Sequence, residues 1–171
     1  MQKRYFHYVQ DLASPLLARY YIDSCIWLNL FKKEGDETKG KPYWKIAGEF
    51  IEYVMSSEDE EIVYTMPVLR EIKLKLPDWQ IYSEKEAYII NEFCFVEVTD
   101  EDISFARKLE AESNYTISFF DCIHTAVCKR IGTILVTRDK KLLVFANKYI
   151  SALKPEQLLE AVKPFDIPFF F

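Results

Sequence analysis

Short apolar runs alternate with longer segments of helical periodicity along most of this 171-residue chain. The periodic segments place apolar residues three and four positions apart, as expected of helices that cover one face of a sheet. Strands that alternate with helices are joined by crossover connections, which make neighbouring strands parallel. The pattern therefore predicts an α/β fold, with a mostly parallel central sheet of about five strands and helices on both faces. The expected strands are 20–22, 62–65, 95–98, 133–137 and 149–153, and the expected helices begin near Ile26, Pro42, Pro67, Ser83, Thr99, Ser118, Asp139 and Pro155.

One domain accounts for most of the chain. Half of the residues are hydrophobic and 16% are aromatic, which is enough apolar material for one core. We expect that domain to span residues 19–162. An extension of unknown role, residues 1–18, precedes it, and an apolar tail rich in phenylalanine, residues 163–171, follows it.

The sequence places the protein in the cytoplasm and away from membranes. No apolar run approaches the roughly 20 residues that a membrane-spanning helix needs. Residues 1–18 mix charged and apolar side chains, unlike a secretion signal. The four cysteines form no CxxC pair and have no histidine at zinc-ligand spacing. We interpret them as free, buried thiols in a reducing compartment.

Charge and glycine content argue against two functional classes. The net charge is −5 and the pI about 5.2, whereas a general nucleic-acid binder usually carries a basic excess. A metal site that gathers carboxylates is compatible with an acidic total. Dinucleotide binding of the Rossmann type is excluded, because the chain has four glycines and no GxGxxG motif.

Four carboxylates occupy similar positions relative to the expected elements. Asp23 directly follows the first strand, and Glu71 lies in the first turns of the helix after the second strand. Asp121 is in the first turn of its helix, and Asp139 follows the fourth strand. Because ligands of open α/β sheets bind beyond the carboxyl ends of the strands, we expect all four side chains at one edge.

Each acid also has an ordinary structural explanation. Asp23 and Asp139 suit the N-cap of a helix, and Asp121 suits a capping box. Glu71 can pair with Lys75 one helical turn later. These explanations account for acids at helix starts, but not for acids that follow two predicted strands in apolar surroundings.

Five short motifs, in this order, make the chain resemble the PIN-domain family. They are Tyr20–Ser24, Pro67–Ile72, Ile117–Ala126, Ile134–Leu142 and Pro155–Leu159. The first four each carry one of the acids, and the last is similar to the closing helix of the family. The resemblance covers about residues 19–162 and implies a PIN-like three-layer sandwich.

The resemblance implies a metal-dependent endoribonuclease that cleaves RNA phosphodiester bonds, such as the toxin of a toxin–antitoxin pair. Asp23, Glu71 and Asp121 would hold a first Mg²⁺ or Mn²⁺ ion, and Asp139 would help to hold a second ion or its waters. These four acids are therefore the expected catalytic and metal-binding residues. Hard divalent cations prefer such carboxylate oxygens. The implied partners are an RNA substrate, an antitoxin protein and a second copy of the chain.

Other side chains near these motifs have expected supporting roles. Ser24 and Thr137 are expected to orient a water molecule or an acid. Lys73, Arg138 and Lys140 lie near the motif ends and are candidate phosphate contacts.

The sequence leaves two other functions to consider, and two residues near the motifs, His124 and Cys25, bear on the site. A catalytically inactive PIN fold that binds RNA or serves as a scaffold is the main alternative. A receiver-like phospho-acceptor domain needs paired acids after its first strand, but Asp23 stands alone there. His124 lies within the apolar stripe of its helix, which favours a packed histidine over a ligand or general base. Cys25 departs from the family, many of whose members have asparagine at this position.

Overall fold

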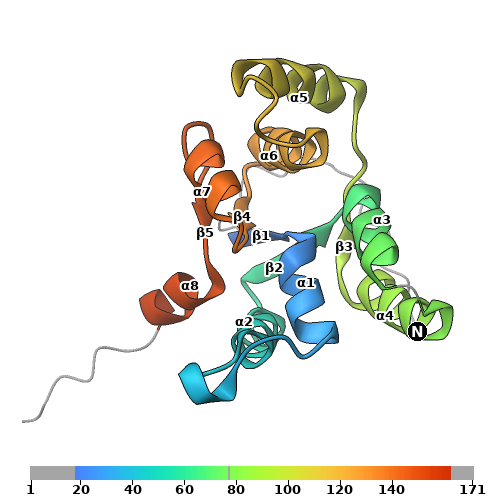
Figure 1. Ribbon diagram of the computed structural model, residues 1–171, viewed down its shortest axis with the longest axis vertical. Helices are drawn as coiled ribbons and strands as arrows, with labels where there is room; N and C mark the ends of the chain where they lie inside the picture. Colours follow the sequence, from blue (N-terminus) through green and yellow to red (C-terminus); the bar gives the residue numbers. More distant parts are fainter. Residues whose placement is uncertain (1–17, 77, 163–171) are drawn as a thin grey trace, which may run out of the picture.

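A five-stranded, wholly parallel sheet forms the centre of the domain (Figure 1). The structure is a computed structural model that describes residues 18–76 and 78–162. The strand order is β3-β2-β1-β4-β5, so β1 lies in the middle, paired with β2 and β4. The strands are β1 (Ala18–Ile22), β2 (Glu60–Tyr64), β3 (Cys94–Phe95), β4 (Ile134–Val136) and β5 (Ala152–Leu153).

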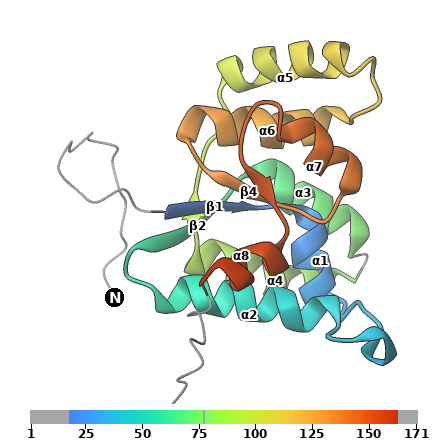
Figure 2. The ribbon, with the colours of Figure 1, turned by 90° about the vertical axis from the view of Figure 1, so that its left-hand side faces the viewer.

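Helices cover both faces of this sheet, which confirms the predicted α/β three-layer architecture. One face carries α6, with α5 stacked on its outer side, and the opposite face carries α1 and α2 (Figures 1 and 2). The helices are α1 (Ser24–Phe31), η1 (Glu37–Lys39, a short 3₁₀ helix), α2 (Tyr43–Ser56), α3 (Met66–Lys75), α4 (Trp79–Glu92), α5 (Asp100–Glu112), α6 (Phe119–Ile131), α7 (Lys140–Ala146) and α8 (Pro155–Val162).

The core follows from the position of β1. Tyr21 and Ile22 are completely buried, as are Leu135 and Val136 of the neighbouring β4. Strands of a parallel sheet are covered on both faces and therefore carry apolar side chains in succession. Tyr21 pairs in register with Val63 and Leu135, which aligns the carboxyl ends of the three central strands. Whatever follows these strands is thus brought to one edge of the sheet.

Local capping chemistry sets several helix ends. Thr99 and Asp102 form a capping box, in which each side chain accepts a hydrogen bond from the other residue's backbone N–H. Gly132 ends α6 with φ of 66°, a left-handed conformation that suits glycine at this position. By contrast, α4 begins at Trp79, earlier than predicted, because Asp78 accepts hydrogen bonds from the next turn's backbone.

The edge strands are shorter than the sequence pattern suggested. β3 and β5 contain two residues each, because each pairs with a single neighbour. Ala18, which the sequence pattern assigned to the N-terminal extension, is the first residue of β1. The rest of that extension and the apolar tail lie outside the described residues. Within the described part of the chain, no helix has the length and apolar character needed to cross a bilayer.

Candidate metal centre

Asp23 sits at the carboxyl end of the central strand. Its backbone N–H donates to the carbonyl of Val136, so the residue continues the β1–β4 ladder before α1 begins. Asp23 occupies the N-cap position of α1, yet its side chain makes no capping hydrogen bond. The residue is only 4% exposed, and its carboxylate accepts hydrogen bonds on Oδ2 from Thr137 Oγ1 (2.6 Å) and Cys25 Sγ (3.0 Å). Capping therefore does not explain this buried acid.

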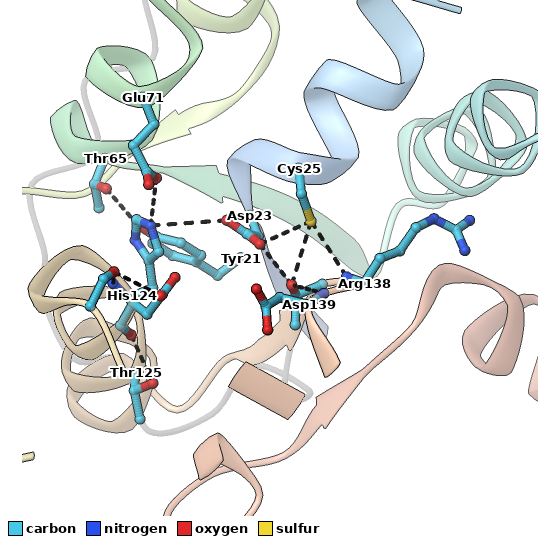
Figure 3. Close-up of polar contacts among 12 residues, drawn as sticks. Tyr21, Asp23, Cys25, Thr65, Glu71, His124, Thr125, Arg138 and Asp139 are labelled. Carbon is cyan, nitrogen blue, oxygen red and sulfur yellow. Dashed lines mark hydrogen bonds and ion pairs between the residues drawn. The ribbon is translucent and has the colours of Figure 1, made fainter. Parts of the chain in front are cut away.

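Glu71 and His124 approach Asp23 from two different helices (Figure 3). His124 Nε2 lies 2.8 Å from Glu71 Oε2 and 4.0 Å from Asp23 Oδ1. One ligand atom from each of the three residues lies within 4.8 Å of the other two. The structure thus brings two of the four predicted acids together, and it adds a histidine to them.

Asp121 and Asp139 lie outside this three-residue group. Asp121 Oδ2 accepts a hydrogen bond from Ser118 Oγ (2.7 Å), and Ser118 Oγ accepts one from the Asp121 N–H (3.2 Å). Asp139 is exposed and caps α7 by accepting from Leu142 N–H at 2.9 Å. Both acids therefore have the local roles that helix starts favour. Those roles use one oxygen of each carboxylate.

Thr137 and Cys25 connect Asp23 to the loop that carries Asp139. Thr137 is completely buried, and its Oγ1 accepts a hydrogen bond from the Asp139 N–H (3.1 Å) while donating to Asp23. Cys25 Sγ accepts from the Arg138 N–H at 3.4 Å. The backbone from Thr137 to Asp139 is therefore held against the Asp23 carboxylate at the sheet edge.

The comparison with known families decides the class of this domain. A family model described as PIN domain matches residues 20–148. The chain belongs to the PIN-domain family. Among curated proteins, none matches it.

Several solved structures share the fold of this PIN domain. PAE2754 from Pyrobaculum aerophilum superposes with a TM-score of 0.59 at 17% identity, covering 86% of this chain and 97% of that one. VapBC2 from Rickettsia felis, bound to a DNA fragment from its promoter, gives 0.62 at 13% identity, covering 80% and 98%. VapC20 from Mycobacterium tuberculosis, described as a sarcin–ricin loop cleaving toxin, gives 0.55 at 16% identity, covering 73% and 93%. At these identities the likeness establishes the fold.

The electrostatics of the site reflect its burial and its histidine. Burial alone would raise the pKa of Glu71, but the hydrogen bond and charge of His124 outweigh it and leave that pKa below its usual value. Burial likewise opposes the charged form of His124, yet the hydrogen bond to Glu71 and the charge of Asp23 raise the His124 pKa. For Asp121, burial raises the pKa, and the charges of Asp23 and Glu71 act in the same direction. Asp121 of this PIN domain thus interacts electrostatically with Asp23 and Glu71, although it lies outside the three-residue group.

The sequence interpretation left His124 out of the candidate site. A packed helix histidine describes its complete burial, but both ring nitrogens also have polar partners. One signal was available: His124 lies three residues after Asp121, so the two share a face of α6. That face points towards the sheet edge where Asp23 lies (Figure 3).

The three candidate phosphate contacts have different surroundings. Lys73 Nζ lies over the ring of Trp79, 5.0 Å from its centroid. The Arg138 side chain is 12% exposed, forms an ion pair with Glu156 and stacks on Tyr43 at 4.3 Å. Lys140 is exposed at the start of α7 and directly follows Asp139.

Proposed function

We propose that this PIN domain is a metal-dependent endoribonuclease. The main support for this proposal is the group formed by Asp23, Glu71 and His124. Their ligand atoms lie within 4.8 Å of one another at the carboxyl edge of the sheet. Both hydrogen bonds to Asp23 fall on Oδ2, whereas its Oδ1 lies 4.0 Å from His124 Nε2. A buried carboxylate with an oxygen of a second acid within 4.8 Å is a suitable ligand for a divalent cation.

The chemistry of the donor set fits Mg²⁺ or Mn²⁺, which prefer carboxylate and water oxygens. Asp23 and Glu71 would hold the ion, with Asp121 beside them and Asp139 towards a second ion or its waters. Two carboxylates about 5 Å apart repel by roughly 3 kcal/mol at an effective dielectric of about 20. Burial is the main reason why the pKa of Asp121 is raised, and the charges of Asp23 and Glu71 add to it. A bound ion would lower the pKa of a water molecule and stabilise charge on the leaving oxygen.

The protein's own side chains then supply orientation. Thr137 fixes Oδ2 of Asp23 and the backbone of Asp139, so the two acids keep their relative position. Ser118 holds one oxygen of Asp121 and leaves the other free. Lys140, which directly follows Asp139 at the start of α7, would contact an RNA phosphate. The burial of Asp23 keeps bulk water from the innermost part of the site.

The biological role we propose is that of a toxin controlled by an antitoxin protein. Structures of similar fold include a toxin–antitoxin complex from Klebsiella pneumoniae and a toxin from Mycobacterium tuberculosis, which supports this role by analogy of fold. We further propose an RNA substrate and a homodimer. The four cysteines are free thiols, in keeping with a cytoplasmic protein.

RNA cleavage by purified protein tests the proposal. Wild type should cleave RNA with Mg²⁺ or Mn²⁺, stop on addition of EDTA, and lose most activity on Asp23→Asn. Glu84→Gln, which changes an exposed acid on α4, is the matched control and should cleave like wild type. Equal cleavage by wild type and Asp23→Asn would reveal a contaminating nuclease. RNA binding without any cleavage would instead support an inactive RNA-binding or scaffold protein.

A further inference from the structure

A chain of hydrogen bonds between buried side chains ends at Glu71. Thr65 Oγ1 lies 2.6 Å from the Tyr21 hydroxyl, which lies 2.8 Å from His124 Nδ1. On the far side of the imidazole, Nε2 lies 2.8 Å from Glu71 Oε2. Thr65, Tyr21 and His124 are all completely buried. They come from the end of β2, from β1 and from α6, so the chain crosses the sheet edge beneath the site (Figure 3).

The hydrogen-bond partners of His124 determine which of its ring nitrogens carries a hydrogen. An ionised carboxylate can only accept hydrogen bonds, so His124 Nε2 must carry the hydrogen that Glu71 accepts. If the ring is neutral, Nδ1 then accepts from Tyr21, which in turn accepts from Thr65. If the ring is charged, Nδ1 donates to Tyr21, which donates to Thr65. In both cases Nε2 is an N–H donor and has no lone pair to offer a cation.

We propose that His124 is a positioning residue that holds the Glu71 carboxylate for the cation and does not itself bind the ion. This proposal rests on the proposed metal site, because it assigns Glu71 Oε1 and Asp23 Oδ1 to the ion and Glu71 Oε2 to His124. The closeness of Nε2 to both acids then reflects orientation by a neighbouring donor, as histidines and hydroxyl groups do around metal ligands.

The other two members of this series of hydrogen bonds, Tyr21 and Thr65, explain how His124 is held. Tyr21 lies in the central strand, where its ring packs in the core and its hydroxyl meets Nδ1. A phenylalanine at position 21 would keep the packing but would leave a buried ring nitrogen without its partner. Thr65 is the last residue in this series of hydrogen bonds, and its hydroxyl gives the buried Tyr21 hydroxyl a second partner. Two hydroxyl-bearing side chains thus fix the orientation of the imidazole that orients Glu71.

The ring tautomer provides a direct test that needs no metal. Long-range ¹H–¹⁵N NMR spectra of the metal-free protein should show His124 with its hydrogen on Nε2. The chain contains two histidines, His7 and His124, so His124→Gln assigns the signals. A neutral ring with its hydrogen on Nδ1 alone would overturn the proposal, because Nε2 would then be a free ligand.

Mn²⁺ binding provides the second test. Electron spin echo spectra of bound Mn²⁺ should show no coupling to a histidine nitrogen, and coupling that disappears in His124→Gln would overturn the proposal. His124→Leu removes the donor and should weaken Mn²⁺ affinity by about 10–100-fold, the usual effect of losing such a partner. His124→Gln, whose amide can donate from a similar position, should restore most of that affinity. Unchanged affinity in His124→Leu would contradict the positioning role.

Tyr21→Phe distinguishes the positioning of His124 from a purely structural role of the hydrogen bonds. It should fold like wild type, as judged by circular dichroism, yet bind Mn²⁺ more weakly. If neither wild type nor Tyr21→Phe binds Mn²⁺ better than Asp23→Asn, the proposed metal site fails. The tautomer measurement still decides separately whether His124 donates to Glu71.

Discussion

Thr137 donates its hydroxyl hydrogen to Asp23 Oδ2 across 2.6 Å, although 114 positions separate the two residues in the chain. Both are buried, and each directly follows a strand of the adjacent pair β1 and β4. The parallel register of these strands is what places the donor beside the acid. The same hydroxyl accepts the Asp139 N–H, so one side chain orients two of the proposed site acids.

Replacing Thr137 by valine should therefore weaken both the fold and the metal site. Valine has nearly the same shape but leaves the buried Asp23 oxygen without this donor, at a cost of about 1–3 kcal/mol. Chemical denaturation should show that loss, and Mn²⁺ titration should show lower affinity. Thr137→Ser keeps the hydroxyl and is the control. If valine and serine variants bind Mn²⁺ equally well, the hydrogen bond does not support the site.

The ion pair between Arg138 and Glu156 should contribute to stability rather than to phosphate binding. Arg138→Met keeps much of the aliphatic stem but leaves Glu156 unpaired. Because the pair is partly buried, we expect a loss of about 1.5–3 kcal/mol in the free energy of unfolding. Glu156→Gln should cost less, and the double variant should lose less than the sum of the two. If the losses in free energy of unfolding are strictly additive, and Arg138→Met alone lowers RNA affinity, Arg138 binds phosphate instead.

Thiol reactivity should differ strongly among the four cysteines. Cys94 is exposed, so the expectation that all four thiols are buried is wrong for this residue. Cys122 and Cys128 are buried, and burial raises the pKa of each of these two thiols to about 12. Burial and the charge of Asp23 raise the pKa of Cys25 well above its usual value. Only the thiolate reacts, so at pH 8 these three should react slowly with Ellman's reagent. We expect one thiol per chain to react rapidly in the native protein and all four to react in guanidinium chloride. Rapid labelling of a thiol in native Cys94→Ser would contradict this.

The sequence was enough to predict the alternating fold, the start of a helix at Thr99 and the family. These features depend on local periodicity and on short motifs, which a single chain displays directly. The lengths of β3 and β5 were overestimated, because edge pairing depends on how far a neighbouring strand extends. The contacts of His124 were also missed, because they join residues 53 and 103 positions away. Residue type predicted burial, whereas the polar partners emerged only from the packed fold.

Asp121 offers the sharpest separation of site chemistry from helix capping. Its raised pKa means that ionisation costs stability in the metal-free fold. Asp121→Asn removes that charge, and its amide oxygen can still accept the hydrogen bond from Ser118. In EDTA at pH 7 the variant should therefore melt at or above the wild-type temperature. That advantage should vanish as the pH falls below the unfolded pKa of about 3.8, where Asp121 is neutral in both states.

Metal addition completes the comparison for Asp121. Mn²⁺ should raise the melting temperature of wild type by binding the native state, and it should raise that of Asp121→Asn less. Ser118→Ala, which loses the cap, is the control: it should melt lower, by the equivalent of about 1 kcal/mol, with a nearly unchanged response to Mn²⁺. If Asp121→Asn behaves like Ser118→Ala, with a lower melting temperature and an intact metal response, Asp121 is a capping acid and does not belong to the metal site.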